Sequence, residues 1–85
     1  MSIINEPVVV WTAADGTPER LVWHGRRYRV TDTATRIEPY WGAMHVPSMP
    51  PVWRFQGTLD DESSLVFDVR FDHSSGAWQL IRIFD

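Results

Sequence analysis

Residues 20–31 read Arg-Leu-Val-Trp-His-Gly-Arg-Arg-Tyr-Arg-Val-Thr, which is two short strand-forming runs around one turn. The dipeptide His24–Gly25 fits a two-residue hairpin turn, in which glycine readily takes the positive φ that such a turn requires. In the second run, strand alternation places Tyr28 on one face and Arg27 and Arg29 on the other. The stretch therefore predicts an antiparallel hairpin with one apolar face and one arginine-rich face.

Similar runs of aromatic and β-branched residues recur along the chain, separated by Asp, Gly, Ser and Pro. No window holds an apolar repeat of 3.6 residues, so we expect no long helix. The clearest alternation is in 65–71, where Leu65, Phe67, Val69 and Phe71 share a face opposite Asp68 and Arg70. The expected strands are 8–12, 20–23, 26–31, 52–57, 65–71 and 78–84, and 33–38 is either a further extended piece or a loop.

These runs predict an all-β fold, a five- or six-stranded antiparallel meander forming a small open barrel or rolled sheet. With 85 residues, the chain is expected to be a single β domain, 1–85, in which 1–6 is flexible. The first residues lack the pattern of a signal peptide, and no apolar stretch is long enough for a membrane helix. Together with the absence of cysteine, this favours a cytoplasmic protein with no membrane partner.

Residues 39–51 form a segment of a different kind, with four of the six prolines. Proline removes backbone donors, so this segment is expected to be neither a central strand nor a helix. We expect a long proline-rich loop that is either a packed lid over a barrel end or a binding loop. Its aromatic and methionine residues are Tyr40, Trp41, Met44 and Met49.

The charges are distributed unevenly along the chain. The formal net charge is −3, yet residues 20–36 hold five of the eight arginines and one acid, Asp32. Arginines beside aromatic residues on a sheet face are typical of phosphate and base contacts. Alternatively, this is a solvated strand face balanced by the acidic turn at 60–62. The overall acidity argues against a strong nucleic-acid binder.

Tryptophan is abundant, with five in the chain. Trp11, Trp23, Trp53 and Trp78 lie in expected strands, and core packing accounts for them. Trp41 lies in the proline-rich loop beside Tyr40, so it either covers the core or presents a binding surface.

No motif indicates catalysis, a metal or a cofactor. The three histidines, His24, His45 and His73, fall in separate turns and loops without metal-ligand spacing. Serines lie outside any G-x-S-x-G elbow, and the chain has no glycine-rich phosphate loop. We therefore expect no enzymatic activity, no metal and no cofactor.

Strand-sized segments with a recognisable pattern lie at 21–30, 52–54, 66–68 and 76–85, with Trp41 between the first two. Together they resemble a small domain of unknown function from high-GC Gram-positive bacteria. A similar segment closes the C-terminus of some ImuB-type proteins, which are relatives of the Y-family DNA polymerases. The resemblance covers about residues 20 to 85 and implies a link to DNA damage tolerance, with DNA or a DNA-repair protein as partner.

Two functions remain open from the sequence. The first is a non-enzymatic module that contacts nucleic acid, with Arg26, Arg27 and Arg29 on phosphates and Tyr40 or Trp41 stacking on bases. The second is a protein-interaction module, in which Trp41, Met44 and Met49 of the loop and an unpaired edge strand at 8–12 dock on a partner. The oligomeric state is accordingly either a monomer or an edge-strand homodimer.

Overall fold

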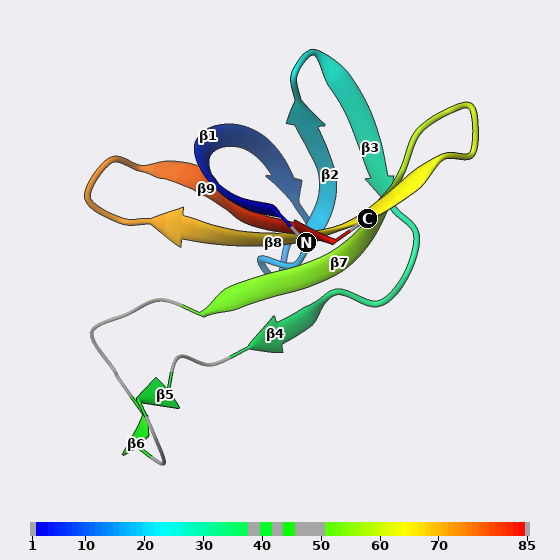
Figure 1. Ribbon diagram of the computed structural model, residues 1–85. Coiled ribbons are helices and arrows are strands. Elements are labelled where there is room, and N and C mark those ends of the chain that lie inside the picture. The colour runs from blue at the N-terminus through cyan, green and yellow to red at the C-terminus, as the bar shows by residue number, and fades with distance from the viewer. Residues whose placement is uncertain (1, 38–39, 42–43, 46–50, 85) are drawn as a thin grey trace.

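The computed structural model describes residues 2–37, 40–41, 44–45 and 51–84, which form nine strands and no helix (Figure 1). Within these residues there is thus no helix that could span a membrane. In chain order the strands are β1 (Ser2–Thr12), β2 (Pro18–Trp23), β3 (Arg26–Val30), β4 (Thr35–Ile37), β5 (Tyr40–Trp41), β6 (Met44–His45), β7 (Val52–Thr58), β8 (Ser64–Asp72) and β9 (Ala77–Phe84).

Seven of these strands form one antiparallel sheet in the order β3-β2-β1-β9-β8-β7-β4. The sheet closes on itself because β3 also pairs with β7, at Arg29–Thr58 and Val30–Gly57. The result is a six-stranded antiparallel barrel with β4 as an additional strand on β7. The predicted all-β antiparallel meander is confirmed, and the pairing of β3 with β7 makes the barrel a closed one.

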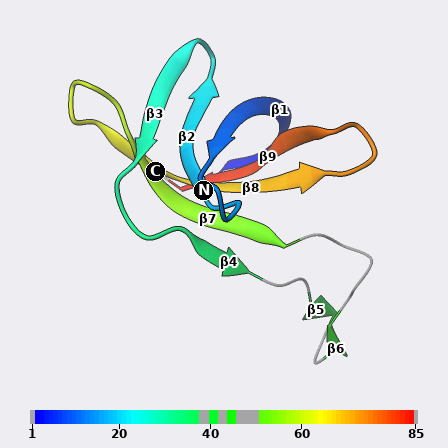
Figure 2. The same cartoon turned by 180° about the vertical axis from the view of Figure 1, so that it is seen from behind.

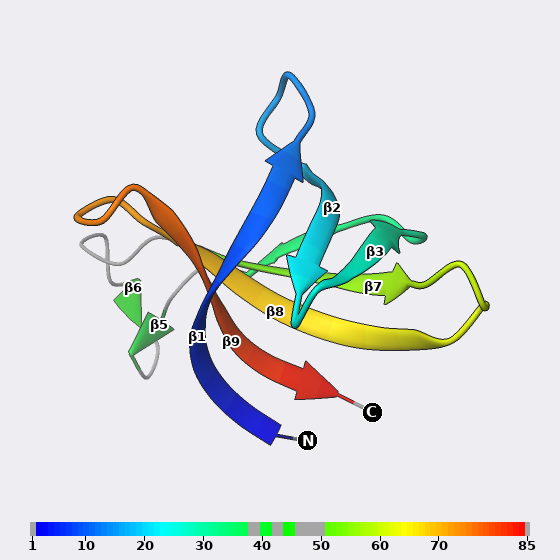
Figure 3. The same ribbon diagram turned by 90° about the horizontal axis from the view of Figure 1, so that it is seen from above.

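The long strand β1 lies between β2 and β9 in the sheet. Its first part pairs with β9 and its second part with β2, and the register shifts between Ile3 and Glu6. Such an irregularity bends a strand and increases its twist, and Figure 3 shows β1 curving beside β9 and then rising toward β2. Residues 2–6, which we expected to be flexible, are thus part of a strand paired with β9.

The hairpin predicted at 24–25 is confirmed, because His24 and Gly25 both have positive φ, 51° and 74°. Asp15, Asp61 and Asp72 stabilise the turns between β1 and β2, between β7 and β8, and between β8 and β9. Each accepts a hydrogen bond from the backbone N–H two residues later in the chain. This local side-chain bond is the reason that aspartate favours turns.

Inward-facing rings and aliphatic side chains fill the barrel. Phe67 is fully buried at the centre, and its ring centroid lies 4.8 Å from that of Tyr28 and 5.9 Å from that of Phe55. Gly57 leaves room for these rings, since a Cβ there would lie 2.7 Å from Phe67 Cε2. The buried apolar residues are Val8, Leu21, Tyr28, Phe55, Phe67, Val69, Leu80 and Ile83.

The short strands β5 and β6, which lie between β4 and β7 in the chain, are outside the barrel sheet. Figure 2 shows β4 beside β7 and the short β5–β6 pair beyond the ends of these two strands. Within the expected 39–51 loop, Tyr40 pairs with His45 and Trp41 with Met44. These four residues form a separate two-stranded sheet, so they add no strand to the barrel.

Candidate nucleic-acid interface

The outer surface of β1, β2 and β3 carries two parallel cross-strand rows. One row joins Trp11, Arg20 and Arg29, and continues to Thr58 on β7. The second row joins Val9, Val22 and Arg27. Directly paired residues project from the same face of a sheet, so these side chains share the outside of the barrel. We call the six residues Val9, Trp11, Arg20, Val22, Arg27 and Arg29 the β1–β3 face.

Two large apolar side chains on this face are exposed to solvent, Val9 at 54% and Trp11 at 51% of their full accessibility. The expectation that Trp11 packs in the core is therefore wrong. Trp11 pairs with Arg20, whereas the core lies on the side of Val8 and Leu21. For Trp23, Trp53 and Trp78 the expected core packing is found in part. All three are partly buried and pack against the central cluster.

The arginines of the β1–β3 face are exposed and form no ion pair with any residue that the structure describes. Among the described residues, Arg20, Arg27 and Arg29 have no carboxylate within salt-bridge distance. A hollow lies over the β1–β3 face, and Asp60 lines it together with Trp11 and Arg27. The face thus carries three guanidinium groups, with the Asp60 carboxylate beside them, in a chain that is acidic overall.

Arg26 has a different environment from Arg27 and Arg29. It is exposed at the start of β3, and its charge contributes to lowering the pKa of Asp61, after the larger effect of hydrogen bonds from Ser63. Arg26 thus lies close enough to the acidic turn at 60–62 to interact with Asp61. Arg27 and Arg29 face solvent, opposite to the buried Tyr28, as the alternation predicted.

The predicted stacking residues Tyr40 and Trp41 belong to β5, not to β1, β2 or β3. The backbones of Tyr40, Trp41 and Met44 belong to β5 and β6, but their side chains lie outside the described part of the structure, and Met49 lies outside it entirely. The exposed aromatic ring beside the arginines is instead Trp11. Its signal in the sequence was weak, because 8–11 is an unbroken apolar run that does not reveal which residues face outward.

The segment 8–12, which we expected to be an unpaired edge strand, is paired with one neighbour at a time. Val8 pairs with Trp78 of β9, and residues 9–12 pair with β2. Among the described residues no strand pairs with the other side of 9–12, so this short edge keeps backbone groups that another chain could pair with. The protein-interaction hypothesis therefore keeps this edge, and its other residues lie in the 39–51 segment.

A polar cluster adjoins the turn between β2 and β3. Glu6 Oε2 accepts a hydrogen bond from Trp23 Nε1 at 3.1 Å and lies 3.1 Å from His24 Nε2. The two rings stack, with centroids 4.1 Å apart. This cluster fixes the turn against β1, and thereby orients the β1–β3 face.

A second charged row crosses the outside of β7, β8 and β9. Arg54, Asp68 and Arg82 are direct cross-strand neighbours. Arg54 holds Asp68 with two bonds, Nε to Oδ1 at 2.8 Å and Nη2 to Oδ2 at 3.0 Å, and Arg82 Nε lies 3.1 Å from Oδ2. The hydrogen bonds with Asp68 raise the pKa of Arg54 above its usual value.

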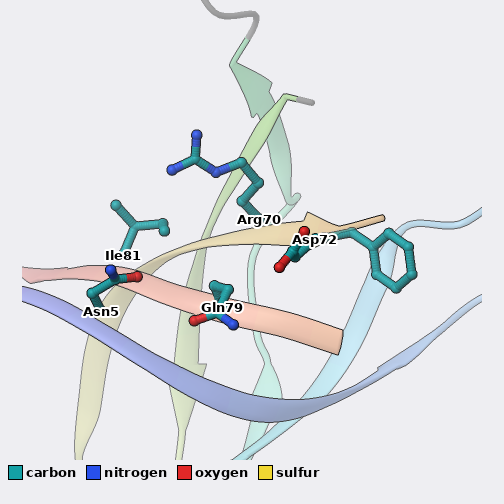
Figure 4. A pocket seen from close by; sticks show the side chains of 6 residues that line it. Asn5, Arg70, Asp72, Gln79 and Ile81 are labelled. Carbon is teal, nitrogen blue, oxygen red and sulfur yellow. The ribbon is translucent and has the colours of Figure 1, made fainter. Parts of the chain in front are cut away.

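Next to this row, a polar hollow lies over β8, β9 and the start of β1. Figure 4 shows Asn5, Arg70, Asp72, Gln79 and Ile81 around it. Asp72 already accepts bonds from Ser74 and Ser75 of its turn. Across the described residues, no group of three or more His, Cys, Asp or Glu side chains is arranged to hold a metal ion.

Comparisons with family models, curated proteins and solved structures found no match to this chain. The resemblance to the domain of ImuB-type proteins therefore stays a prediction.

Proposed function

We propose that this protein is a binding module for single-stranded nucleic acid and that the β1–β3 face is its contact surface. The observation that carries the proposal is the row Trp11–Arg20–Arg29. It sets an exposed indole ring beside two guanidinium groups that form no ion pair within the described part of the chain. Arg27 adds a third guanidinium group in the neighbouring row.

The two kinds of side chain match the two parts of a nucleic-acid strand. Guanidinium groups form charge-assisted hydrogen bonds with phosphate oxygens. An exposed indole offers a flat surface on which a base stacks, and stacking contributes about 1–3 kcal/mol per base. Bases are free to stack on a protein ring only when they are unpaired, which favours a single strand over a duplex.

The net negative charge of the chain weakens its attraction to nucleic acid. With a net charge of −3, the protein lacks the long-range attraction of a basic domain. Binding then depends on local contacts and is sensitive to salt. Three phosphate contacts predict a slope of about −2 for log K against log salt concentration, at about −0.7 per contact with a single strand.

The direct test is fluorescence anisotropy of a labelled oligothymidylate of about twelve nucleotides, within the usual site sizes of single-strand binders. We expect binding in low salt that weakens with the stated slope. The triple variant Arg20→Ala, Arg27→Ala, Arg29→Ala should lose it. Arg36→Ala is the control, since Arg36 is also exposed but lies on β4, outside the β1–β3 face.

Trp11→Phe tests the aromatic contact separately. Stacking of a base on Trp11 should quench part of the protein fluorescence, and that part of the quenching should be absent from the variant. If wild-type protein fails to bind in low salt, or if the triple variant binds as tightly as Arg36→Ala, the proposed contact surface is wrong.

A further inference from the structure

The outer surface of β7, β8 and β9 has an arrangement that the β1–β3 face lacks, a carboxylate held between two arginines. Asp68 is fully buried at 0% exposure, although strand alternation turns it away from the core residues Phe67 and Val69. The side chains of Arg54 and Arg82 cover it and are themselves 42% and 37% exposed. The carboxylate is therefore hidden, and the two guanidinium groups are what this surface shows to solvent.

Both guanidinium groups converge on one atom. Arg54 Nη2 and Arg82 Nε lie 3.0 Å and 3.1 Å from the same Oδ2 of Asp68. Each guanidinium carries a single positive charge and Asp68 supplies one negative charge, so the cluster keeps an excess positive charge. Arg70, two residues beyond Asp68 on the same face of β8, adds a further cationic group.

The hydrogen-bond donors of this cluster are only partly used. A guanidinium group has five N–H donors, and Arg54 directs two nitrogens at Asp68. Arg82 Nε is buried and close to Oδ2 but lacks hydrogen-bond geometry, and Arg82 has no hydrogen-bond acceptor among the described residues. Arg82 Nε already faces Asp68, so the donors left for a ligand are the remaining Nη N–H groups of Arg54 and Arg82.

The arginines are also held in place before any ligand arrives. Arg54 is fixed by its paired bonds with Asp68, and its Cζ lies 4.7 Å from the centroid of the Phe84 ring. A side chain that is already ordered loses less entropy on binding, which favours affinity. Two ordered guanidinium groups with free donors match the oxygens of a phosphate group better than lysines would.

We propose that Arg54 and Arg82, positioned by Asp68, form a second anion site that binds a phosphate group. The phosphate belongs either to a small phosphate compound or to the backbone of a nucleic acid, and its oxygens would accept the unused N–H donors. This site lies on different strands from the β1–β3 face, and it stands whether or not that face binds nucleic acid.

The test is a titration of ¹⁵N-labelled protein with inorganic phosphate, followed through the arginine Nε–H signals. Sodium chloride at equal ionic strength is the control solution, and the signals are assigned with Arg54→Lys, Arg82→Lys and Arg36→Lys. We expect saturable shifts of the Arg54 and Arg82 signals, while Arg36 follows the chloride control. Arg82→Gln should weaken phosphate binding about tenfold, the effect of losing a charged hydrogen-bond partner.

A second arm uses oligothymidylate and the variant Arg20→Ala, Arg27→Ala, Arg29→Ala. Shifts of Arg54 and Arg82 with the oligomer in this variant identify a nucleic-acid backbone as the source of the phosphate. Shifts with inorganic phosphate alone identify a small compound. Non-saturable shifts in wild-type protein, or shifts equal to those in chloride, would overturn the anion site and leave the β1–β3 proposal untouched.

Discussion

Arg20 and Arg29 lie directly opposite each other on β2 and β3, and both are exposed on the outside of the barrel. Like charges in opposed cross-strand positions destabilise a sheet by roughly 0.2–1 kcal/mol. No carboxylate among the described residues forms an ion pair with either arginine. This repulsion would be relieved by an anion bound between them, as the proposed phosphate contact requires.

Arg29→Glu should therefore separate stability from binding. The new carboxylate would face Arg20, so we expect the free energy of unfolding to rise by about 0.5 kcal/mol. Oligothymidylate binding should fall at least tenfold, because one favourable contact becomes repulsive. Urea unfolding and fluorescence anisotropy measure the two effects. In Arg27→Glu the cross-strand partner is Val22, so binding should fall without the gain in stability. Equal stability changes in the two variants would contradict this account.

Asp68→Asn should destabilise the barrel strongly. The amide keeps the shape of the side chain but leaves Arg54 and Arg82 without the negative charge between them. Removing one partner from a fully buried ion pair costs about 3–5 kcal/mol. Because both arginines are partly exposed, we expect about 2 kcal/mol in urea unfolding. Asp32→Asn is the control at an exposed aspartate and should change stability by less than about 0.5 kcal/mol.

Asp72→Ala should lower stability at neutral pH but much less in acid. Hydrogen bonds from Ser74 and Ser75 lower the pKa of Asp72 below its usual 3.8. A group with a lowered folded-state pKa stabilises the fold above its unfolded pKa, and this contribution is lost as the pH falls through the folded value. The urea midpoints of wild type and variant should thus differ at pH 7 and converge below about pH 3.8. A constant difference across that range would show that ionisation of Asp72 does not matter.

Gly57→Ala should destabilise the core, because the added Cβ would lie 2.7 Å from Phe67 Cε2 and 3.0 Å from Tyr28 Cβ. Overpacking of this kind costs about 2 kcal/mol. A double-mutant cycle with Phe67→Leu provides the control, since the smaller side chain removes the closest contact. The double variant should be more stable than the sum of the single effects predicts, by at least about 1 kcal/mol. Additive effects would place the strain elsewhere.

Much of the local structure could be predicted from the residues. The turn at 24–25 followed from its glycine, and the opposite orientation of Tyr28 and Arg27 followed from alternation. The turn and the alternation both depend on residues adjacent in the chain, and the backbone geometry alone fixes how such residues are oriented. The candidate site was harder to predict, because Trp11 and Arg29 are far apart in the sequence. They share one row only because β1 pairs with β2 and β2 pairs with β3.

By itself, the sequence determined the approximate positions of the six barrel strands, most of the turns and the side of each alternating strand that is apolar. Only the tertiary structure decided that β1 lies inside the sheet, that Trp11 faces solvent and that Asp68 is buried beneath two arginines. The physical reason is that strand formation depends on local backbone and side-chain preferences. Exposure depends instead on which distant strands pair and in which register, and in an apolar run such as 8–11 no alternation signals it.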